Sequence, residues 1–230
     1  MACKIIGSGV QGLSTAVVLE QLGYDTTILT KNTAYIDGLD IPDVATDYAA
    51  ASIYPVKIES QYTENELITF AERTFKPFFE QSGVPVRKQT HYYLYEDSRD
   101  ITLPDRMNIT PVRDYDGRVP SRESHTVDSG YVCDEYFVEM PKYVPLLYAL
   151  YKDMGGEIVE TTVTKHDVER LNATHTVFNC AGSGSKELFG DESVCPVKGH
   201  IVGTPYEGDT PFSFGYTYTP EGTDEYTYMY

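Results

Sequence analysis

The first thirty residues alternate between short apolar runs and a helical pattern. Residues 4–6 form an apolar run, and apolar side chains then recur over residues 13–22 at the three- and four-residue spacing of a helix. Gly23 stands where a helix C-cap is expected, and residues 25–30 are rich in β-branched side chains. This order predicts a strand, a helix and a second strand, which together make a βαβ unit.

The hydrophobic period changes again further along the chain. Residues 64–81 carry a helical pattern, whereas residues 84–136 alternate with a period of two, which is typical of an antiparallel sheet. The helical period returns over residues 141–154, and strand-like segments follow at residues 157–163 and 176–180. The chain therefore predicts an α/β domain that is interrupted by a β-rich domain and then resumes.

We expect the interrupted domain to comprise residues 1–83 and 139–195, and the inserted domain to comprise residues 84–138 and 196–230. The run of glycine and serine at residues 182–185 is expected to be a loop.

Composition excludes several classes of protein. Of 230 residues, 35 are acidic and 18 are basic, so the formal charge is −17 and a phosphate backbone or an anionic membrane surface is an unfavourable partner. No apolar run reaches the length of a membrane span, and no signal peptide is visible, so we expect a cytoplasmic or peroxisomal protein. The four cysteines and five histidines lack metal-ligand spacing, so no metal site is expected.

A glycine motif follows the first predicted strand. Gly7-Ser8-Gly9-Val10-Gln11-Gly12 matches the G-x-G-x-x-G pattern, in which the glycines permit a tight turn, close approach to a pyrophosphate and packing of helix on strand. The motif opens a helix, whose N-terminal N–H groups favour phosphate. The sequence therefore predicts a dinucleotide site, and the alternative is a glycine turn without function.

The end of the second predicted strand departs from the usual dinucleotide pattern. An acidic residue normally accepts the ribose hydroxyls there, but this chain has Thr30-Lys31-Asn32. The threonine or the asparagine is the remaining candidate for the ribose, and Lys31 favours an extra phosphate. The absence of the acid argues against NAD.

Three stretches in order resemble the D-amino-acid oxidase family of FAD-dependent oxidoreductases, which includes D-aspartate and glycine oxidases. They are IGSGVQGLSTA at residues 6–16, TDYAAASIYP at residues 46–55 and VFNCAG at residues 177–182. The resemblance implies an α/β fold with a Rossmann-type FAD-binding domain and an inserted antiparallel β-sheet substrate domain. It implies FAD as the cofactor, an amino acid or amine and O2 as substrates, and a possible homodimer.

The same resemblance assigns roles to residues along the chain. It implies FAD contacts from the phosphate-binding loop, from the ribose and phosphate segments, from the stretch facing the isoalloxazine, and from the adenine and phosphate turns. In that order, these residues are Gly7, Ser8, Gly9, Val10, Gln11 and Gly12; Lys31, Asn32, Thr46 and Asp47; Ala50, Ala51 and Ser52; and Val163, Ala181 and Gly182.

The activity implied is oxidative deamination of a D-amino acid, with hydride transfer to the flavin and O2 as acceptor, giving an imino acid and hydrogen peroxide. Tyr228 and Tyr226 would close over the substrate, although alternating tyrosines also suit one face of an amphipathic strand. A glycine- or sarcosine-type amine oxidase is the alternative within the enzymes. A non-catalytic truncated scaffold is the alternative outside them.

The sequence ends before the C-terminal third of the family pattern. By the resemblance, that third carries the arginine that clamps the substrate carboxylate, so the clamp is not assigned to any arginine present. Arg113 and Arg118 become the candidates only if the 230-residue chain itself turns over an amino acid. We therefore expect the 230-residue chain alone to bind FAD weakly and to turn over no amino acid.

Overall fold

A computed structural model gives the structure of two units of the chain. Unit 1 comprises Met1–Ala49 and Met140–Thr204, and unit 2 comprises Ala50–Glu139 and Pro205–Tyr230. The residues described are 2–32, 45–49, 51–52, 61–81, 83–99, 110–112, 125–196, 200, 202, 214–223 and 225–229. In this part of the chain no helix has the length and apolar character needed to cross a membrane.

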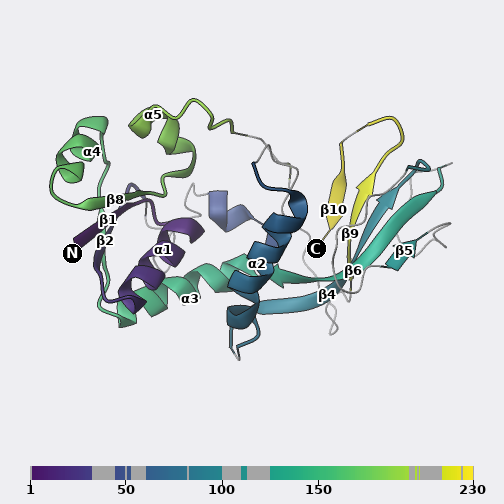
Figure 1. Cartoon of the computed structure of the whole chain (residues 1–230), viewed down its shortest axis with the longest axis horizontal. Helices are drawn as coiled ribbons and strands as arrows, with labels where there is room; N and C mark the ends of the chain where they lie inside the picture. The colour runs from purple at the N-terminus through teal and green to yellow at the C-terminus, as the bar shows by residue number, and fades with distance from the viewer. Residues whose placement is uncertain are drawn as a thin grey trace. The chain divides into compact units, whose positions relative to one another are not determined.

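Unit 1 contains a parallel sheet whose strand order is β7-β2-β1-β8. The strands are β1 (Ala2–Ile6), β2 (Asp25–Thr30), β7 (Glu157–Glu160) and β8 (Thr176–Asn179). β1 pairs in parallel with β2, so the predicted βαβ unit is present (Figure 1). Ile5 and Ile28 face each other in register and are fully buried, as expected for the centre of a parallel sheet.

Two helices, α1 (Val10–Gln21) and α3 (Met140–Asp153), pack against each other in unit 1. Tyr151 of α3 is fully buried, and a buried phenol needs partners for its hydroxyl. That hydroxyl accepts from Thr26 Oγ1 at 3.0 Å and donates to the carbonyl oxygens of Thr26 at 3.1 Å and Glu157 at 3.0 Å. One side chain therefore ties α3 to β2 and β7.

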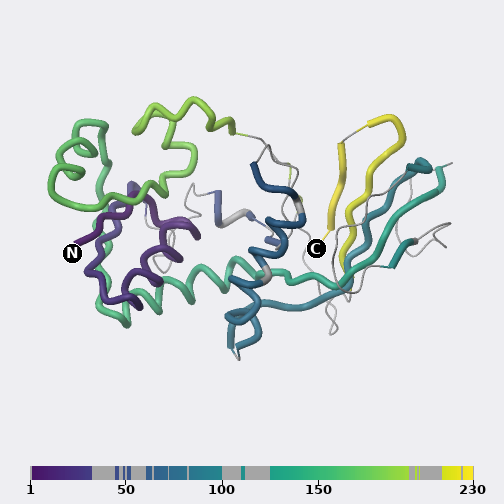
Figure 2. Tube along the Cα trace, in the orientation of Figure 1, coloured from purple at the N-terminus to yellow at the C-terminus, as the bar shows by residue number. Residues whose placement is uncertain are grey.

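Four short helical segments of unit 1 are absent from the sequence prediction. They are the 3-10 helix η1 (Ala45–Tyr48), α4 (Lys165–Asn172), the 3-10 helix η2 (Gly182–Gly184) and α5 (Ser185–Phe189), so the expected loop at residues 182–185 is wrong (Figure 2). Asn179 Oδ1 explains the turn, because it accepts from the Ala181 N–H at 3.2 Å and the Ser185 hydroxyl at 3.0 Å. These bonds fold the chain directly from β8 into the helical segments.

Unit 2 contains a six-stranded sheet of order β10-β9-β4-β6-β3, with β5 paired to β6. The strands are β3 (Ala51–Ser52), β4 (Val86–Tyr95), β5 (Thr110–Val112), β6 (Ser129–Val138), β9 (Phe214–Thr219) and β10 (Thr227–Met229). The antiparallel sheet expected over residues 84–136 is present, because β4 and β5 both pair with β6 in antiparallel fashion. β9 joins this sheet in parallel with β4, so the whole sheet is mixed. A long connection separates these two strands, and such a connection permits parallel pairing where a hairpin does not.

Helix α2 (Glu64–Phe79) also belongs to unit 2. Phe79 contacts the Tyr136 ring of β6, with ring centroids 6.2 Å apart, and the Tyr136 hydroxyl donates to Glu80 at 2.7 Å. These contacts explain why residues 50–83 cluster with unit 2 and not, as expected, with the first domain; residues 196–204 cluster with unit 1. The assignment of cofactor and substrate to the two units stays a prediction.

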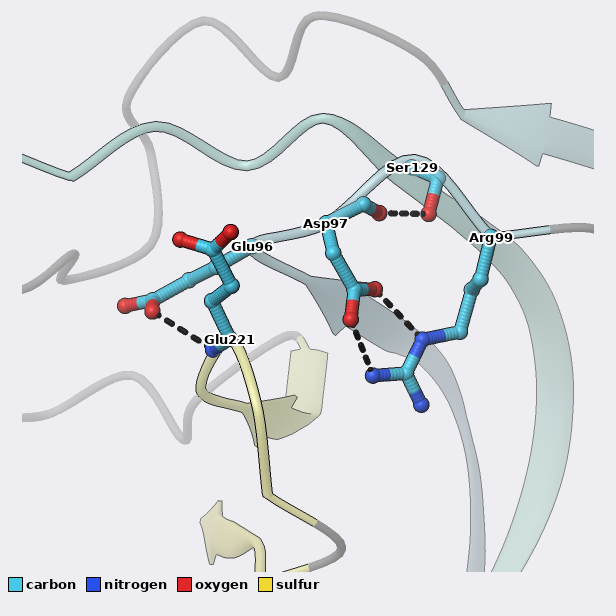
Figure 3. A network of polar contacts seen from close by, with 5 residues as sticks. All are labelled: Glu96, Asp97, Arg99, Ser129 and Glu221. Atoms are coloured by element: carbon cyan, nitrogen blue, oxygen red, sulfur yellow. Dashed lines mark hydrogen bonds and ion pairs between the residues drawn. The ribbon is translucent and has the colours of Figure 1, made fainter.

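A network of polar contacts surrounds the C-terminal end of β4 in unit 2 (Figure 3). The Arg99 guanidinium pairs with both carboxylate oxygens of Asp97, at 2.5 and 2.6 Å, and the Ser129 hydroxyl donates to the Asp97 carbonyl at 2.6 Å. The backbone N–H of Glu221 donates to Glu96 at 2.8 Å. The segment after β4 is thereby fixed to the start of β6 and to the turn after β9.

The two faces of the unit 2 sheet differ in chemistry. One face carries an apolar cluster of Leu94, Val127 and Tyr218, against which further aromatic rings pack. Side chains alternate along a strand, so the residues of β4 on either side of this cluster's members point to the opposite face. That opposite face carries Gln89 and His91, which are polar and buried.

Candidate functional site

A cavity of about 910 Å³ opens in unit 1, within the range of small-molecule sites. Its walls come from the segments that follow β1, β2, β7 and β8, and ligands of parallel α/β sheets bind at these carboxyl ends. The predicted site residues that line it are Gly7, Ser8, Gly9, Val10, Gln11, Lys31, Asn32, Thr46, Val163, Ala181 and Gly182.

The backbone of the glycine motif leaves no room for side chains at two positions. Gly7 has a φ of +105°, and a Cβ there would lie 2.3 Å from the Cys180 carbonyl oxygen. A Cβ on Gly12 would lie 1.9 Å from the Gly7 carbonyl oxygen. Gly12 therefore lies beneath the loop and permits the turn, as the motif predicts, but it does not line the cavity.

The N-terminus of α1 differs from those of α2 and α4. Thr63 and Thr164 cap α2 and α4 in capping boxes, whereas Gly9 precedes α1 without a side-chain cap and the first turn carries no acidic residue. The Val10 N–H has Thr46 Oγ1 as an acceptor, at a long 3.4 Å. The positive end of this helix is thus available to an anion, and the cavity fits the diphosphate of a dinucleotide.

No acidic residue directly follows β2, and hydroxyl hydrogen bonds hold the end of this strand instead. The hydroxyls of Ser8 and Thr30 lie 3.0 Å apart, and each donates to the Asn32 carbonyl, at 3.0 Å from Ser8 and 2.7 Å from Thr30. Both hydroxyl residues are buried. They fix the end of β2 to the glycine loop, so Thr30 contributes to the shape of the cavity, and Lys31 beside it is exposed.

The segment after β7 forms another wall of the cavity. The Thr161 N–H donates to the Thr30 carbonyl at 2.7 Å, which extends the β2–β7 pairing by one residue. Val163 is a predicted site residue in this segment, whereas most of its neighbours are not predicted from the sequence. The missed lining residues of this wall and of α5 are Thr161, Thr162, Thr164, Lys165, Glu187 and Leu188. The signal that was available is the Thr164-x-x-Asp167 capping box, which marks the start of α4.

Cys180 lies at the turn after β8, where it also lines the cavity. Its N–H donates to the Ile6 carbonyl at 3.0 Å, and its thiol lies 3.9 Å from Thr15 Oγ1. Burial raises the pKa of the Cys180 thiol. A protonated thiol is a poor nucleophile, so this wall supplies packing and backbone to the cavity.

The other predicted site residues are divided between the two units. Asp47 lies in the 3-10 helix η1 (Ala45–Tyr48) of unit 1, and Ala50 falls outside the described residues. Ala51 and Ser52 form β3 of unit 2, paired with the end of β6. Ala51 and Ser52 are not among the residues that line the cavity.

The predicted catalytic tyrosines are in and next to β10 of unit 2. Tyr228 is 39% exposed and Tyr226 is 50% exposed, with ring centroids 6.1 Å apart. Tyr228 pairs directly with Thr217 of β9, and residues directly opposite in an antiparallel pair share a face. The Thr217 hydroxyl in turn lies 2.9 Å from His91 Nε2. Tyr228 therefore shares the polar face of the sheet.

A buried carboxylate forms the centre of that polar face. Glu135 of β6 is 4% exposed, and it accepts from Tyr93 at 2.8 Å, from Ser52 at 3.0 Å and from the Cys133 thiol at 3.6 Å. Burial, reinforced by the Glu135 charge, raises the pKa of Tyr93 far above its usual value of 10. Tyr93 thus remains a hydrogen-bond donor.

His91 lies next to this group and is fully buried. Burial lowers its pKa from 6.5 to about 4, against the opposing effect of the Glu135 charge. His91 is therefore neutral at physiological pH. Neither Glu135 nor His91 is predicted as a site residue, because no spacing motif in the sequence connects them. Within the described ranges no group of three or more His, Cys, Asp or Glu side chains is placed to hold a metal ion.

Comparison with known proteins shows which family this chain resembles. A model of the FAD dependent oxidoreductase family matches residues 4–230. A D-amino acid oxidase of Dugesia ryukyuensis is 25% identical over 212 residues, which are 88% of this chain and 60% of that protein. The human D-aspartate oxidase is 26% identical over 212 residues, with 86% of this chain and 58% of that protein covered.

The chain spans about three fifths of the length of these curated relatives. Among solved structures, glycine oxidase from Geobacillus kaustophilus has a TM-score of 0.54 at 13% identity, covering 82% of this chain and 57% of that one, which shows a shared fold. The family model covers nearly the whole chain and includes the glycine loop. This chain therefore belongs to the family of FAD-dependent oxidoreductases.

Proposed function

We propose that the full-length protein oxidatively deaminates a D-amino acid, with O2 as the electron acceptor. The observation that carries the proposal is the uncapped N-terminus of α1 above the glycine loop, in a chain of an FAD-dependent family. The names of its relatives, D-amino acid oxidase and D-aspartate oxidase, support an amino-acid substrate. Bound FAD supplies a two-electron acceptor for this chemistry.

The residues of unit 1 would bind and orient the cofactor. The N–H groups at the start of α1 would hold the diphosphate, and Gly9 would permit its close approach. Lys31 and Lys165, both exposed at the rim, add positive charge to the cavity. The carbonyl groups and threonines after β7 form the wall around Val163, which we assign to the adenine end.

The residues of unit 2 position the substrate. We assign Ser52 to the isoalloxazine side and Tyr228 to the substrate side, because both contact or share the polar face around Glu135. In the reaction the substrate loses its Cα hydride and an amine proton to become an imine. The two electrons and two protons pass to O2, which yields hydrogen peroxide, and water then hydrolyses the imine.

The test uses protein expressed from the complete reading frame. We expect the purified protein to show flavin absorbance and to produce peroxide with D-amino acids but not with their L-enantiomers. Glycine and sarcosine belong in the same panel, because preferred turnover of these would assign the protein to amine oxidation in place of D-amino-acid oxidation. Bound flavin without peroxide from any substrate in the panel would overturn the proposed activity.

A further inference from the structure

The strongest signal outside the cofactor cavity is a buried carboxamide without hydrogen bonds. Gln89 of β4 is 7% exposed, and neither its Nε2 nor its Oε1 has a partner among the described residues, although both atoms are fully buried. Burying an amide without hydrogen bonds is costly, and such groups are rare in folded proteins. A polar side chain held in this state is suited to receive a ligand group that both donates and accepts.

A glycine on the neighbouring strand leaves space for the carboxamide of Gln89. A Cβ on Gly215 of β9 would lie 2.9 Å from Gln89 Nε2 and 2.7 Å from His91 Nδ1. Glycine inside a strand weakens it and marks a close approach. Because Gly215 has no side chain, the side chains of Gln89 and His91 on β4 can occupy the space over this position of β9.

The closest candidate partner for Gln89 is engaged elsewhere. Its register partner across the β4–β6 pair is Glu135, whose carboxylate accepts from Tyr93, Ser52 and Cys133. Two residues away from Gln89 on the same strand and face, Arg87 also has a buried Nε without a partner in the described part of the chain. Gln89 and Arg87 thus present three N–H donors, on two nitrogen atoms, and one acceptor oxygen on the same face.

This set of groups selects a class of ligand. A carboxylate would pair with the Arg87 cation and with the Gln89 amide N–H, but it would leave Gln89 Oε1 without a donor and would bring a second negative charge towards Glu135. An apolar group would leave every polar atom unpaired. A primary carboxamide accepts from Arg87 Nε–H and from the Gln89 amide N–H while donating to Gln89 Oε1.

We propose that Gln89, with Arg87, binds the side-chain carboxamide of the substrate, so that the enzyme prefers D-asparagine or D-glutamine to apolar and acidic D-amino acids. This inference rests on the proposed D-amino-acid oxidation and names its substrate class. Its location agrees with that reaction, because Glu135, the register partner of Gln89, bonds to Ser52, which we assign to the flavin side. Tyr228 shares the same face through Thr217.

The first test needs only the full-length wild-type protein. We expect KM for the better carboxamide substrate to be about tenfold or more below that of its apolar isostere, D-leucine for D-asparagine or D-methionine for D-glutamine, because polar sites reject analogues that leave them unpaired. KM for D-aspartate and D-glutamate should be as high as KM for the apolar substrates. Equal KM values across these substrates, or a preference for the acids, would overturn the inference.

The second test replaces the carboxamide. Gln89→Met keeps the length of the side chain and removes both unpaired atoms, so KM should rise about tenfold for the carboxamide substrate and stay unchanged for D-methionine. Gln81→Met, the same change at an exposed glutamine of unit 2, is the matched control and should change neither value. A uniform rise for all substrates would overturn the inference, because it would indicate a role unrelated to the side chain.

Binding separates this inference from the proposed function. The thermal shift caused by D-glutamine or D-asparagine in the flavin-loaded wild-type protein should exceed the shift caused by D-methionine or D-leucine, and Gln89→Met should abolish the difference. This result supports the carboxamide site even if no amino acid yields peroxide, in which case the proposed oxidation alone fails. Equal thermal shifts would overturn the carboxamide site while peroxide production still supports the oxidation.

Discussion

The cavity of unit 1 and the polar face of unit 2 use different chemical groups. The cavity uses backbone N–H groups, glycines and small side chains, and its buried hydroxyls at Ser8 and Thr30 are satisfied. The polar face uses buried ionisable side chains around Glu135, with Gln89 unsatisfied beside them among the described residues. The first arrangement fits a constant ligand, the cofactor, whereas the second has the side-chain variety that the proposed substrate site requires.

The largest expected effect tests the backbone part of this comparison. Gly12→Ala places a Cβ 1.9 Å from the Gly7 carbonyl oxygen, and backbone cannot move aside without rebuilding the loop. We expect purified full-length protein to lose its flavin absorbance and to lose more than about 4 kcal/mol of stability, the range of severe steric substitutions.

Gly23→Ala is the control for this change. Gly23 has a positive φ of +82°, but no atom lies within 4 Å of the place that an alanine Cβ would take. Only backbone strain of about 1 kcal/mol is therefore expected, with normal flavin content. Retention of flavin by Gly12→Ala would contradict the account of the loop.

The next largest effect tests the buried ionisable side chains of the polar face. His91 has a pKa of about 4 in the folded protein against 6.5 in the unfolded chain, so the unfolded state binds more protons between these values. The contribution of neutral His91 to the free energy of unfolding is complete above pH 6.5. It is lost as the pH falls towards 4, by up to about 3 kcal/mol. Urea unfolding at a series of pH values measures this loss.

His91→Gln should flatten the pH dependence over this window, since the substituted side chain does not titrate there. The same change at His175, which lies outside the polar face at the start of β8, should leave the profile as it is in the wild type. An identical slope in the His91 variant would show that other groups produce the acid sensitivity.

A pair of tyrosines in unit 2 tests whether burial makes the hydrogen bonds of the polar face important for stability. Tyr93→Phe removes the donor 2.8 Å from the buried Glu135, and leaving a buried acceptor underbonded costs about 1–3 kcal/mol. Tyr136→Phe removes the same kind of bond, 2.7 Å to Glu80, at an exposed position, where well under about 1 kcal/mol is expected. Chemical denaturation compares them, and equal costs would mean that burial of Glu135 is unimportant.

The smallest effect concerns the helix ends. Thr63→Ala removes the cap of α2 and should cost about 1 kcal/mol without changing flavin content. Thr74→Ala lies on the same helix, where the hydroxyl bonds back to the Phe70 carbonyl at 2.8 Å, and should be nearly neutral. Loss of flavin in the Thr63 variant would break the distinction between capped structural helices and the uncapped α1.

Some of this structure follows from the sequence because it depends on local constraints. The glycine spacing at residues 7–12 predicts both α1 and the wall of the cavity, since the steric rule acts within one turn. The helix α4 carries a readable signal in its capping box that periodicity alone does not reveal, because eight residues give too few repeats.

The polar face could not be predicted in this way. Glu135, Gln89 and Gly215 come from three strands far apart in the sequence, and only the register of β6, β4 and β9 brings them together. A shift of one residue would send each side chain to the other face. The parallel pairing of β4 with β9 was missed for the same reason, because strand direction across a long connection has no local signature.

The order β7-β2-β1-β8 has a consequence for synthesis of the protein. β1 and β2 leave the ribosome first, but both of their neighbours are translated only after the whole segment Ala50–Glu139 of unit 2. At roughly 5–20 residues per second the first two strands wait on the order of ten seconds with both edges unpaired. During that interval the nascent chain is exposed to edge pairing, so ribosome-associated chaperones have their greatest effect on this protein before β8 emerges.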